Sequence, residues 1–246
     1  MLGGFALTSG NGNNIALPTR KDRLLLSYLA LNAGRTLPRE KLYGLLWADR
    51  EEVQARGSLR QSLAALRDAF HTAGLDPLKS DRDSVTLDLA GIEIDALDFS
   101  RLSTDSASLD QVILLYHGEL LAGIEPPPPE FEHWLKPERQ RLEDLAAKVV
   151  EQVAASDLPE ATVKRALELG RQLIGQDRLG EPVWRALMRM LARRRDRSEA
   201  MKTYAKCRDA LMEELGVSPE LETEQLYRDI LTDRQAAPIA LETTPK

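Results

Sequence analysis

Residues 55–68 read ARGSLRQSLAALRD, and their spacing predicts an amphipathic helix with two different faces. At about 100° per residue, Leu59, Leu63, Leu66 and Phe70 share one stripe, which is typical of a helix packed on a core. The remaining surface combines arginines, small residues and one amide: Arg56, Arg60, Arg67, Gly57, Ala64 and Gln61. Cations suit phosphates and guanine edges, an amide suits adenine, and small side chains permit close approach, so this surface favours a helix in the DNA major groove. An ordinary solvated, arginine-rich helix flank is the alternative interpretation.

Short β-like runs lie on both sides of this helix. Residues 5–8 and 15–17 flank the turn-rich string GNGNN at 10–14, which predicts a hairpin. LKSDRDSVTLDL at 78–89 alternates around a polar turn and predicts a second hairpin, the wing of a winged helix. A further strand is expected over residues 92–94.

Three helices are predicted between the two hairpins. Thr19 and Asp22 form a capping signal for the first, and Pro38 is expected in the first turn of the second. The third helix is expected to start at a cap-like signal over residues 49–52 and to run to about Ala73.

Charge and composition restrict the classes of function. Residues 20–82 carry twelve Lys/Arg against eight Asp/Glu, a local balance of +4 in a chain of net charge −6, which permits a nucleic-acid partner there. The single Cys207 and the three scattered histidines exclude a disulfide framework and an ordinary zinc site. No G-x-S-x-G, H-E-x-x-H or GxxxxGK[ST] motif occurs, so we expect neither an enzyme nor a bound cofactor or metal.

The distribution of apolar residues predicts a cytoplasmic chain. No apolar run approaches the roughly 20 residues that span a bilayer, so no membrane association is expected. The start of the sequence, MLGGFALTSG, lacks the basic and apolar regions of a secretory signal. A location in the cytoplasm, on the nucleoid, is the expectation.

The second part of the chain reads as helical repeats. Amphipathic runs occupy 130–156, 159–174, 181–194, 197–215 and 219–231. The residues Trp184, Leu187, Met188, Leu191, Ala200 and Tyr204 approximate the pattern of a tetratricopeptide (TPR) repeat. Cys207 falls at a repeat-packing position and is expected in the core. The basic string RRRDR at 193–197 is interpreted as a solvated helix end, with nucleic-acid contact as the alternative.

Several stretches also resemble a known family. LPTRKDRLLLSYLALNAGRTLPREKLYGLLW (17–47) and QARGSLRQSLAALRDAF (54–70) look like the OmpR-type winged helix of the Streptomyces antibiotic regulatory protein (SARP) family. LYHGELLAGI (115–124), FEHWLKPERQRLEDLA (131–146) and EAMKTYAKCRDALMEELGVSPELETEQLYRDIL (199–231) are similar to the bacterial transcriptional activator domain of that family. The resemblance implies a DNA-binding activator whose recognition helix is the 51–73 segment. It also implies promoter sites built from direct repeats and occupied by paired protomers.

The wing departs from the family pattern. Asp81 and Asp83 stand where many members have glycines and basic residues, which leaves Arg82 as the one plausible phosphate contact in the wing. The complete set of candidate DNA contacts is Arg56, Ser58, Arg60, Gln61, Ala64, Arg67, Arg82, Arg35 and Arg39.

The sequence therefore predicts a mainly α fold with small β elements. An OmpR-like winged helix-turn-helix is expected over 1–98, an all-α, TPR-like activator domain over 99–235 and a flexible tail over 236–246. The predicted function is sequence-specific activation of transcription, with double-stranded promoter DNA, a second protomer on the DNA and RNA polymerase as partners. A protein-interaction scaffold, or a sensory fragment of a larger regulator, without intrinsic DNA binding is the alternative.

Overall fold

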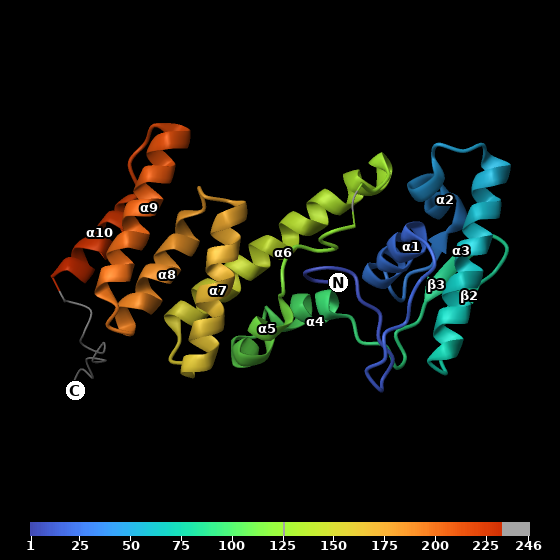
Figure 1. The fold of residues 1–246 in the computed structure, drawn as a ribbon, viewed down its shortest axis with the longest axis horizontal. Coiled ribbons are helices and arrows are strands. Elements are labelled where there is room, and N and C mark those ends of the chain that lie inside the picture. Colours follow the sequence, from blue (N-terminus) through green and yellow to red (C-terminus); the bar gives the residue numbers. More distant parts are fainter. Residues whose placement is uncertain (125, 233–246) are drawn as a thin grey trace, which may run out of the picture. The chain divides into compact units, whose positions relative to one another are not determined.

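The computed structural model describes residues 1–124 and 126–232, and helices make up most of this range (Figure 1). The elements follow in the order α1 (Arg20–Leu31), β1 (Leu37–Pro38), α2 (Arg39–Trp47), α3 (Glu52–Thr72), β2 (Leu78–Ser80), β3 (Ser84–Leu87), α4 (Asp95–Leu102), a short 3₁₀ helix η1 (Ser106–Ser108), α5 (Leu109–Leu115), α6 (Pro129–Ala155), α7 (Glu160–Gln176), α8 (Glu181–Arg193), α9 (Arg197–Leu215) and α10 (Leu221–Leu231). The predicted fold class, mainly α with small β elements, is confirmed. The predicted tail at 236–246 lies outside the described residues.

The chain divides into two compact units, and both are discontinuous in sequence. The first unit contains Met1–Arg101 and Leu115–Leu142, and the second contains Leu102–Leu114 and the residues from Glu143 onward. Helix α6 therefore contributes its first half to the first unit and its second half to the second. The boundary expected at residue 98 stays a prediction.

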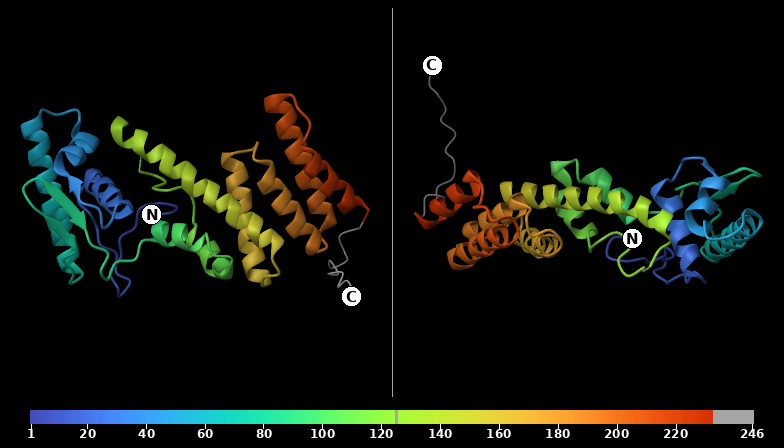
Figure 2. Two further views of the ribbon diagram at one scale, coloured as in Figure 1. Left: turned by 180° about the vertical axis from the view of Figure 1, so that it is seen from behind. Right: turned by 90° about the horizontal axis from the view of Figure 1, so that it is seen from above.

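In the first unit, α1, α2 and α3 pack together beside a small sheet (Figure 2). The predicted capping box of α1 is confirmed: the Asp22 N–H donates to Thr19 Oγ1 (3.1 Å), and the Thr19 N–H donates to the Asp22 carboxylate (2.9 Å). These two bonds satisfy amide groups that would otherwise lack partners at the helix start. The predicted core stripe of α3 is also confirmed, because Leu59, Leu63 and Leu66 are all buried.

The start of α3 differs from the prediction. Glu51 is the N-cap residue and makes no side-chain capping bond, so a cap formed by Asp49 and Glu52 is wrong. Both carboxylates are engaged elsewhere: Asp49 lies 3.6 Å from Lys21 Nζ, and Glu52 pairs with Arg56.

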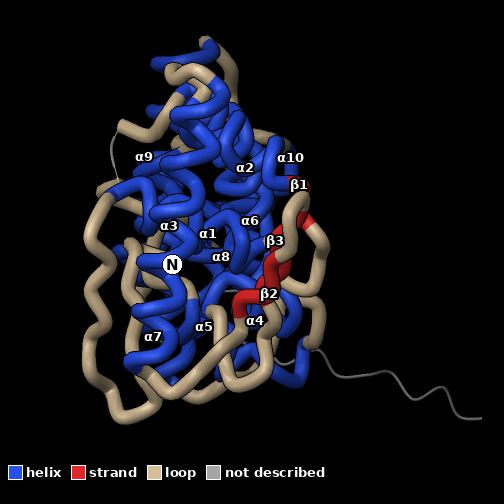
Figure 3. Tube along the Cα trace, turned by 90° about the vertical axis from the view of Figure 1, so that its right-hand side faces the viewer, coloured by secondary structure: helices blue, strands red, loops and turns tan. Residues whose placement is uncertain are grey.

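The three strands form one antiparallel sheet in the order β1-β3-β2 (Figure 3). The wing hairpin is confirmed, with Lys79 opposite Thr86 in the ladder. Strand β1 was not predicted; in it Leu37 pairs with Val85. Pro38, which was expected inside α2, instead precedes that helix as its N-cap at the edge of the sheet, where a missing N–H is tolerated.

Two other predicted sheet elements are wrong. Residues 5–8 and 15–17 form no strands: the turn between them is closed by an isolated bridge between Thr8 and Asn14 and a hydrogen bond from the Ile15 N–H to the Leu7 carbonyl oxygen (2.8 Å). Residues 92–94 form no strand either. They lead into α4, where the Ile94 carbonyl oxygen accepts hydrogen bonds from the N–H groups of two residues in the first turn of that helix.

Aromatic contacts join the first half of α6 to α1. The Trp134 ring meets Tyr28 edge-on at a centroid distance of 4.7 Å and meets Phe131 at 5.0 Å. Tyr28 and Phe131 are almost completely buried. The segment 115–142 thus completes the core of the first unit.

The second unit is an array of helices in which α8 packs against α7, α9 and α10 (Figure 2). Helices α6 to α10 match the five predicted amphipathic runs closely, whereas α4 and α5 match none of them. Cys207 is fully buried with Trp184 and Leu211, which confirms its predicted place in the core. Helices α7 and α8 approach closely at Gly170, where a Cβ atom would lie 2.7 Å from Leu187 Cδ2.

A buried polar network holds α10 onto α8. The Glu181 carboxylate accepts hydrogen bonds from the Glu220 N–H at the start of α10 (3.0 Å) and from Thr223 Oγ1 (2.6 Å). Arg185, one turn further along α8, donates to Glu220 Oε2 (2.7 Å) and Thr223 Oγ1 (3.0 Å). Glu181 therefore supplies, from another helix, the cap that α10 lacks in its own sequence.

The basic string 193–197 also binds helix ends. Arg193 Nη1 donates to the carbonyl oxygens of Ala154 (3.0 Å) and Ser156 (2.7 Å) at the end of α6. Arg197 donates to the Leu231 carbonyl oxygen at the end of α10. Cations suit these positions because the last carbonyl groups of a helix lack partners and carry partial negative charge.

Candidate nucleic-acid interface

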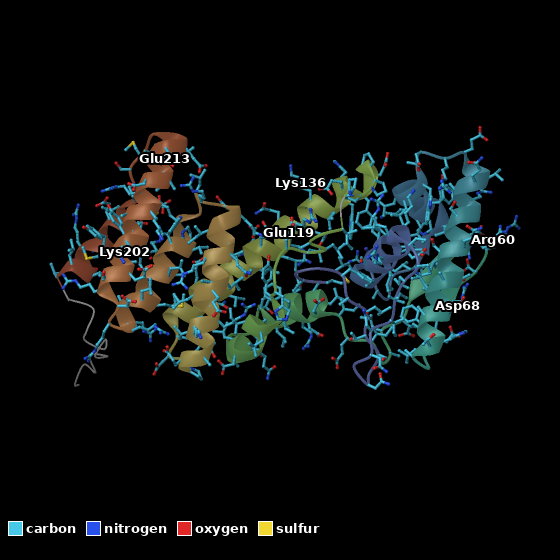
Figure 4. The ribbon with its side chains drawn as sticks, in the orientation of Figure 1. Arg60, Asp68, Glu119, Lys136, Lys202 and Glu213 are labelled. Atoms are coloured by element: carbon cyan, nitrogen blue, oxygen red, sulfur yellow. The ribbon has the colours of Figure 1, made fainter. Side chains whose placement is uncertain are left out.

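The exposed face of α3 carries four of the nine predicted DNA contacts. Arg56, Arg60, Gln61 and Ala64 are all exposed along the N-terminal two-thirds of the helix. Arg60 extends away from α1 and α2 (Figure 4). Among the described residues, no hydrogen-bond or ion-pair partner is recorded for the Arg60 side chain. The structure thus brings these four predicted residues onto one accessible surface.

The C-terminal part of α3 offers a different surface. It borders a cavity of about 680 Å³ that the 9–14 turn also lines. Ala65, Asp68 and Thr72 contribute to the cavity wall. Asp68 is exposed (Figure 4), and its negative charge opposes the approach of phosphates. The surface suited to nucleic acid is therefore the N-terminal part of α3.

Arg56 is held by two neighbours that sequence reasoning missed. It pairs with the Glu52 carboxylate, and its guanidinium lies 5.9 Å from the centre of the Tyr43 ring. The Tyr43 hydroxyl in turn donates to Glu52 Oε1 (3.2 Å). Hydrogen bonding with Tyr43 and the charge of Glu52 raise the pKa of Arg56. The i, i+4 spacing of Glu52 and Arg56 was readable from the sequence, but the contribution of Tyr43 from α2 was not.

Ser58 connects α3 to a second missed residue, Arg50. Arg50 Nη1 donates to Ser58 Oγ (2.7 Å), and Ser58 Oγ donates to the Gln54 carbonyl oxygen (2.9 Å). Arg50 is exposed in the loop between α2 and α3. Its guanidinium is thus held beside the exposed face of α3 by a neutral partner.

A groove of about 670 Å³ runs between the start of α1 and the middle of α3. Gln61, Arg50 and Lys21 are among its lining residues. Burial lowers the pKa of Lys21, and the positive charges of Arg50 and Arg20 lower it further, against the opposing effect of Asp49. The groove thus brings cations together with the carboxylates of Asp22, which lines it, and Asp49, which lies 3.6 Å from Lys21 Nζ.

The Asp81 carboxylate stabilises the turn of the wing. The Asp81 carboxylate accepts hydrogen bonds from the N–H groups of Asp83 (2.8 Å) and Ser84 (2.7 Å) and from Ser84 Oγ (2.9 Å). The bonds from Asp83 and then Ser84 lower the pKa of Asp81. Arg82 is exposed at the tip of this turn. Asp81 therefore has a structural task that a glycine would not perform.

The remaining predicted residues occupy other surroundings. Arg67 is partly buried and donates to Ser80 Oγ in β2, which links α3 to the wing. Arg39 is at the start of α2, where its backbone N–H donates a hydrogen bond to the Asp83 carbonyl oxygen (2.9 Å). Arg35 is exposed in the turn that follows α1.

The described residues contain no cluster of three or more His, Cys, Asp or Glu side chains that could hold a metal ion. None of the helices in the described ranges has the length and apolar character needed to cross a membrane.

Comparisons with known proteins identify relatives over most of the chain. The chain is 28% identical over 238 residues to regulatory protein AfsR of Streptomyces coelicolor, an alignment that covers 90% of this chain and 23% of AfsR. The AfsR of Streptomyces griseus is also 28% identical, over 92% of this chain and 24% of that protein. The chain thus spans about a quarter of the length of these two relatives. Regulatory protein DnrI of Streptomyces peucetius is 25% identical over 90% of this chain and 87% of DnrI.

The fold is similar to that of Mycobacterium tuberculosis EmbR, solved in complex with a low-affinity phosphopeptide. The TM-score is 0.70 at 20% identity, and the match covers 94% of this chain and 64% of EmbR.

The family model described as the bacterial transcriptional activator domain matches residues 90–231, more than half of the chain. The three Streptomyces relatives are regulatory proteins by name. The chain therefore belongs to the family of transcriptional regulators that carry the bacterial transcriptional activator domain, the family of the Streptomyces antibiotic regulatory proteins.

Proposed function

We propose that this protein activates transcription by binding promoter DNA through α3, which enters the major groove from its N-terminal part. One observation carries the proposal: Arg56, Arg60, Gln61 and Ala64 are exposed together on α3 while the opposite face of the helix is buried. This arrangement offers guanidinium groups, an amide and small side chains to base edges and phosphates. The protein acts in the cytoplasm, on the nucleoid.

The phosphate contacts come from both sides of α3. Arg50 and Lys21 line the groove beside α1, and Arg82 lies at the wing tip. Together they surround the recognition surface with positive charge, which attracts the DNA backbone and makes binding depend on salt. Arg67 supports the site indirectly, because its bond to Ser80 fixes the position of the wing.

The helical array provides the protein contacts. Family membership supports promoter sites built from direct repeats, occupied by two protomers, with the α7–α10 array in contact with the second protomer or with RNA polymerase. Arrays of this kind present extended surfaces that suit such contacts.

The test is a titration of fluorescent DNA with the purified chain. The DNA is the region upstream of the reading frame of this protein, and binding is followed by anisotropy from about 50 to 200 mM salt. We expect binding that weakens steeply with salt. We expect the double variant Arg56→Ala/Arg60→Ala to lose at least about tenfold in affinity, in line with the loss of one good base contact.

A matched control removes two positive charges far from α3 in sequence. Lys136→Ala/Lys148→Ala changes two exposed lysines of α6, outside the α7–α10 array, and should leave DNA affinity unchanged. If the wild type does not bind at low salt, or if both double variants bind as well as the wild type, DNA recognition by α3 is rejected. The chain would then act as a scaffold for protein contacts.

A further inference from the structure

The arginines around the start of α3 differ in the charge of their partners. Arg56 faces the Glu52 carboxylate, which cancels much of its positive charge toward an approaching phosphate. It is also confined by the Tyr43 ring, and the Tyr43 hydroxyl holds the same carboxylate. Two helices thus combine to fix the position of one guanidinium while reducing its net electrostatic attraction for the DNA backbone.

Arg50 is fixed in a different way. Its partner is the neutral Ser58 hydroxyl, and the charges of Arg50 and Lys21 repel each other across the groove that both residues line. Arg50 therefore keeps its full charge while its position is restrained. A phosphate attracts such a group strongly, because the interaction depends on charge and requires little directional precision.

We propose that these partners divide the work between the two arginines: Arg56, neutralised by Glu52 and braced by Tyr43, reads a guanine base, whereas Arg50 binds a phosphate. Glu52 and Tyr43 are then positioning residues for the base-reading arginine. This inference rests on the proposed function. Arg56 in α3 then provides sequence specificity, and Arg50 in the preceding loop provides electrostatic affinity for DNA.

The physical reason lies in what each contact demands. Guanine offers two acceptors, O6 and N7, to the fork of N–H groups on a guanidinium, and this bidentate contact requires a fixed orientation. Removing side-chain freedom before binding improves such a contact because less entropy is lost on complex formation. An arginine paired with a carboxylate stays charged but attracts phosphates less strongly. The pairing of Arg56 with Glu52 therefore favours discrimination between DNA sequences over general affinity for DNA.

The experiment begins with a DNA site selected from a random-sequence duplex library by the full chain. Affinities for the selected duplex and for an unrelated duplex are then measured across a salt series. Arg50→Ala should weaken binding to both duplexes by a similar factor and reduce the salt slope by about 1. Arg56→Ala should weaken binding to the selected duplex by roughly 5- to 100-fold, with little change for the unrelated duplex or in the salt slope.

Replacing the positioning residues Glu52 and Tyr43 should change the two affinities in a different way. Glu52→Gln removes the neutralising charge, so the unrelated duplex should bind more tightly and the ratio of selected to unrelated affinity should fall. Tyr43→Phe removes only the hydroxyl, so the ratio should fall without a change in the salt slope. A role limited to folding would instead lower both affinities together and lower the thermal unfolding midpoint. Both changes are expected to leave folding intact because the Glu52–Arg56 ion pair and the Tyr43–Glu52 hydrogen bond are both exposed, and exposed pairs contribute little to stability.

Base substitution identifies the atom that is read. Each guanine of the selected site is replaced in turn by 7-deazaguanine, which lacks the N7 acceptor. The wild type should lose at least about fivefold at one guanine, and Arg56→Ala should be insensitive to substitution at that guanine.

Two outcomes overturn the inference and are easily told apart. If Arg56→Ala reduces the salt slope by about 1 and weakens both duplexes equally, Arg56 is a phosphate contact and the division of roles is wrong, although α3 still binds DNA. If the library yields no bound site and the wild type binds no duplex at low salt, the proposed function fails and this inference fails with it.

Discussion

Replacing Glu181 should release α10 from the helical array. In the native state its carboxylate accepts hydrogen bonds from the Glu220 N–H and from Thr223, and it lies 3.9 Å from Arg185. Only 7% of the Glu181 surface is exposed. Glu181→Ala therefore leaves a helix N-terminus without its cap and a mostly buried guanidinium without one of its carboxylate neighbours.

The size of the effect follows from these contacts. A hydrogen bond to a charged group contributes about 1.5–3 kcal/mol, and two such bonds are lost together. Removing one member of a buried ion pair costs about 3–5 kcal/mol, and the two figures overlap because they describe the same contacts. We expect Glu181→Ala to lower the free energy of unfolding by about 3–5 kcal/mol, a decrease in Tm of roughly 6–20 °C for a protein of this size.

Thermal unfolding followed by circular dichroism measures the total loss, and hydrogen exchange locates it. Amide protons of α10 should exchange much faster in the variant, whereas those of α1 and α3 should not change. Glu222→Ala is the matched control, since it removes an exposed carboxylate from the first turn of the same helix and should alter stability by less than about 0.5 kcal/mol. A Glu181→Ala variant within about 1 kcal/mol of wild type, with unchanged exchange in α10, would refute this account of how α10 is held.

Three further predictions concern single residues. Gly57→Ala should stabilise the protein by about 0.5–1 kcal/mol, because an added Cβ meets nothing within 4 Å and alanine favours the helix. The same change should weaken specific DNA binding in the anisotropy titration, and an unchanged affinity would show that bases do not approach the backbone at this position. Gly170→Ala should destabilise by about 1 kcal/mol in urea unfolding, because the clash with Leu187 outweighs the gain in helix propensity; a gain in stability would show that α7 and α8 have room to separate. Burial raises the pKa of Cys207 to about 12, so the unfolded thiol, with a pKa of about 8.5, ionises first and stability should fall as pH rises from about 8.5 toward 12. Urea unfolding between about pH 7.5 and 10.5 should show this fall, and Cys207→Ala should reduce it; an equal slope in wild type and variant would contradict the assignment.

Local periodicity was sufficient to predict α3 and the helices α6 to α10. Their apolar residues recur at helical spacing because each helix buries one face, and that signal survives in any window of a dozen residues. The capping box of α1 was equally accessible, because Thr19 and Asp22 lie three residues apart and their bonds are local.

Contacts between elements were not accessible in this way. Strand β1 has only two residues, too few for any alternation, and its pairing with β3 joins positions almost 50 residues apart. The bonds from Arg50 to Ser58 and from Tyr43 to Glu52 depend on how α2 meets α3, and no pattern in one helix encodes that geometry. The same holds for Glu181, which looks like an ordinary acidic first-turn residue of α8 until α10 is placed beside it.

The interleaving of the two units affects the order in which this protein is made. The first unit lacks its last segment until residue 142 has been synthesised, although its preceding segment ends at residue 101. At about 5–20 residues per second, the ribosome takes roughly 2–8 s to cross that interval. During this time Tyr28 has no Trp134 to cover it. The residues of the second unit at 102–114 emerge in the same interval, still without the helices that will surround them. The first unit can therefore complete its core only once residue 142 has left the ribosome, and the 102–114 segment must wait for the residues from Glu143 onward before its unit can form.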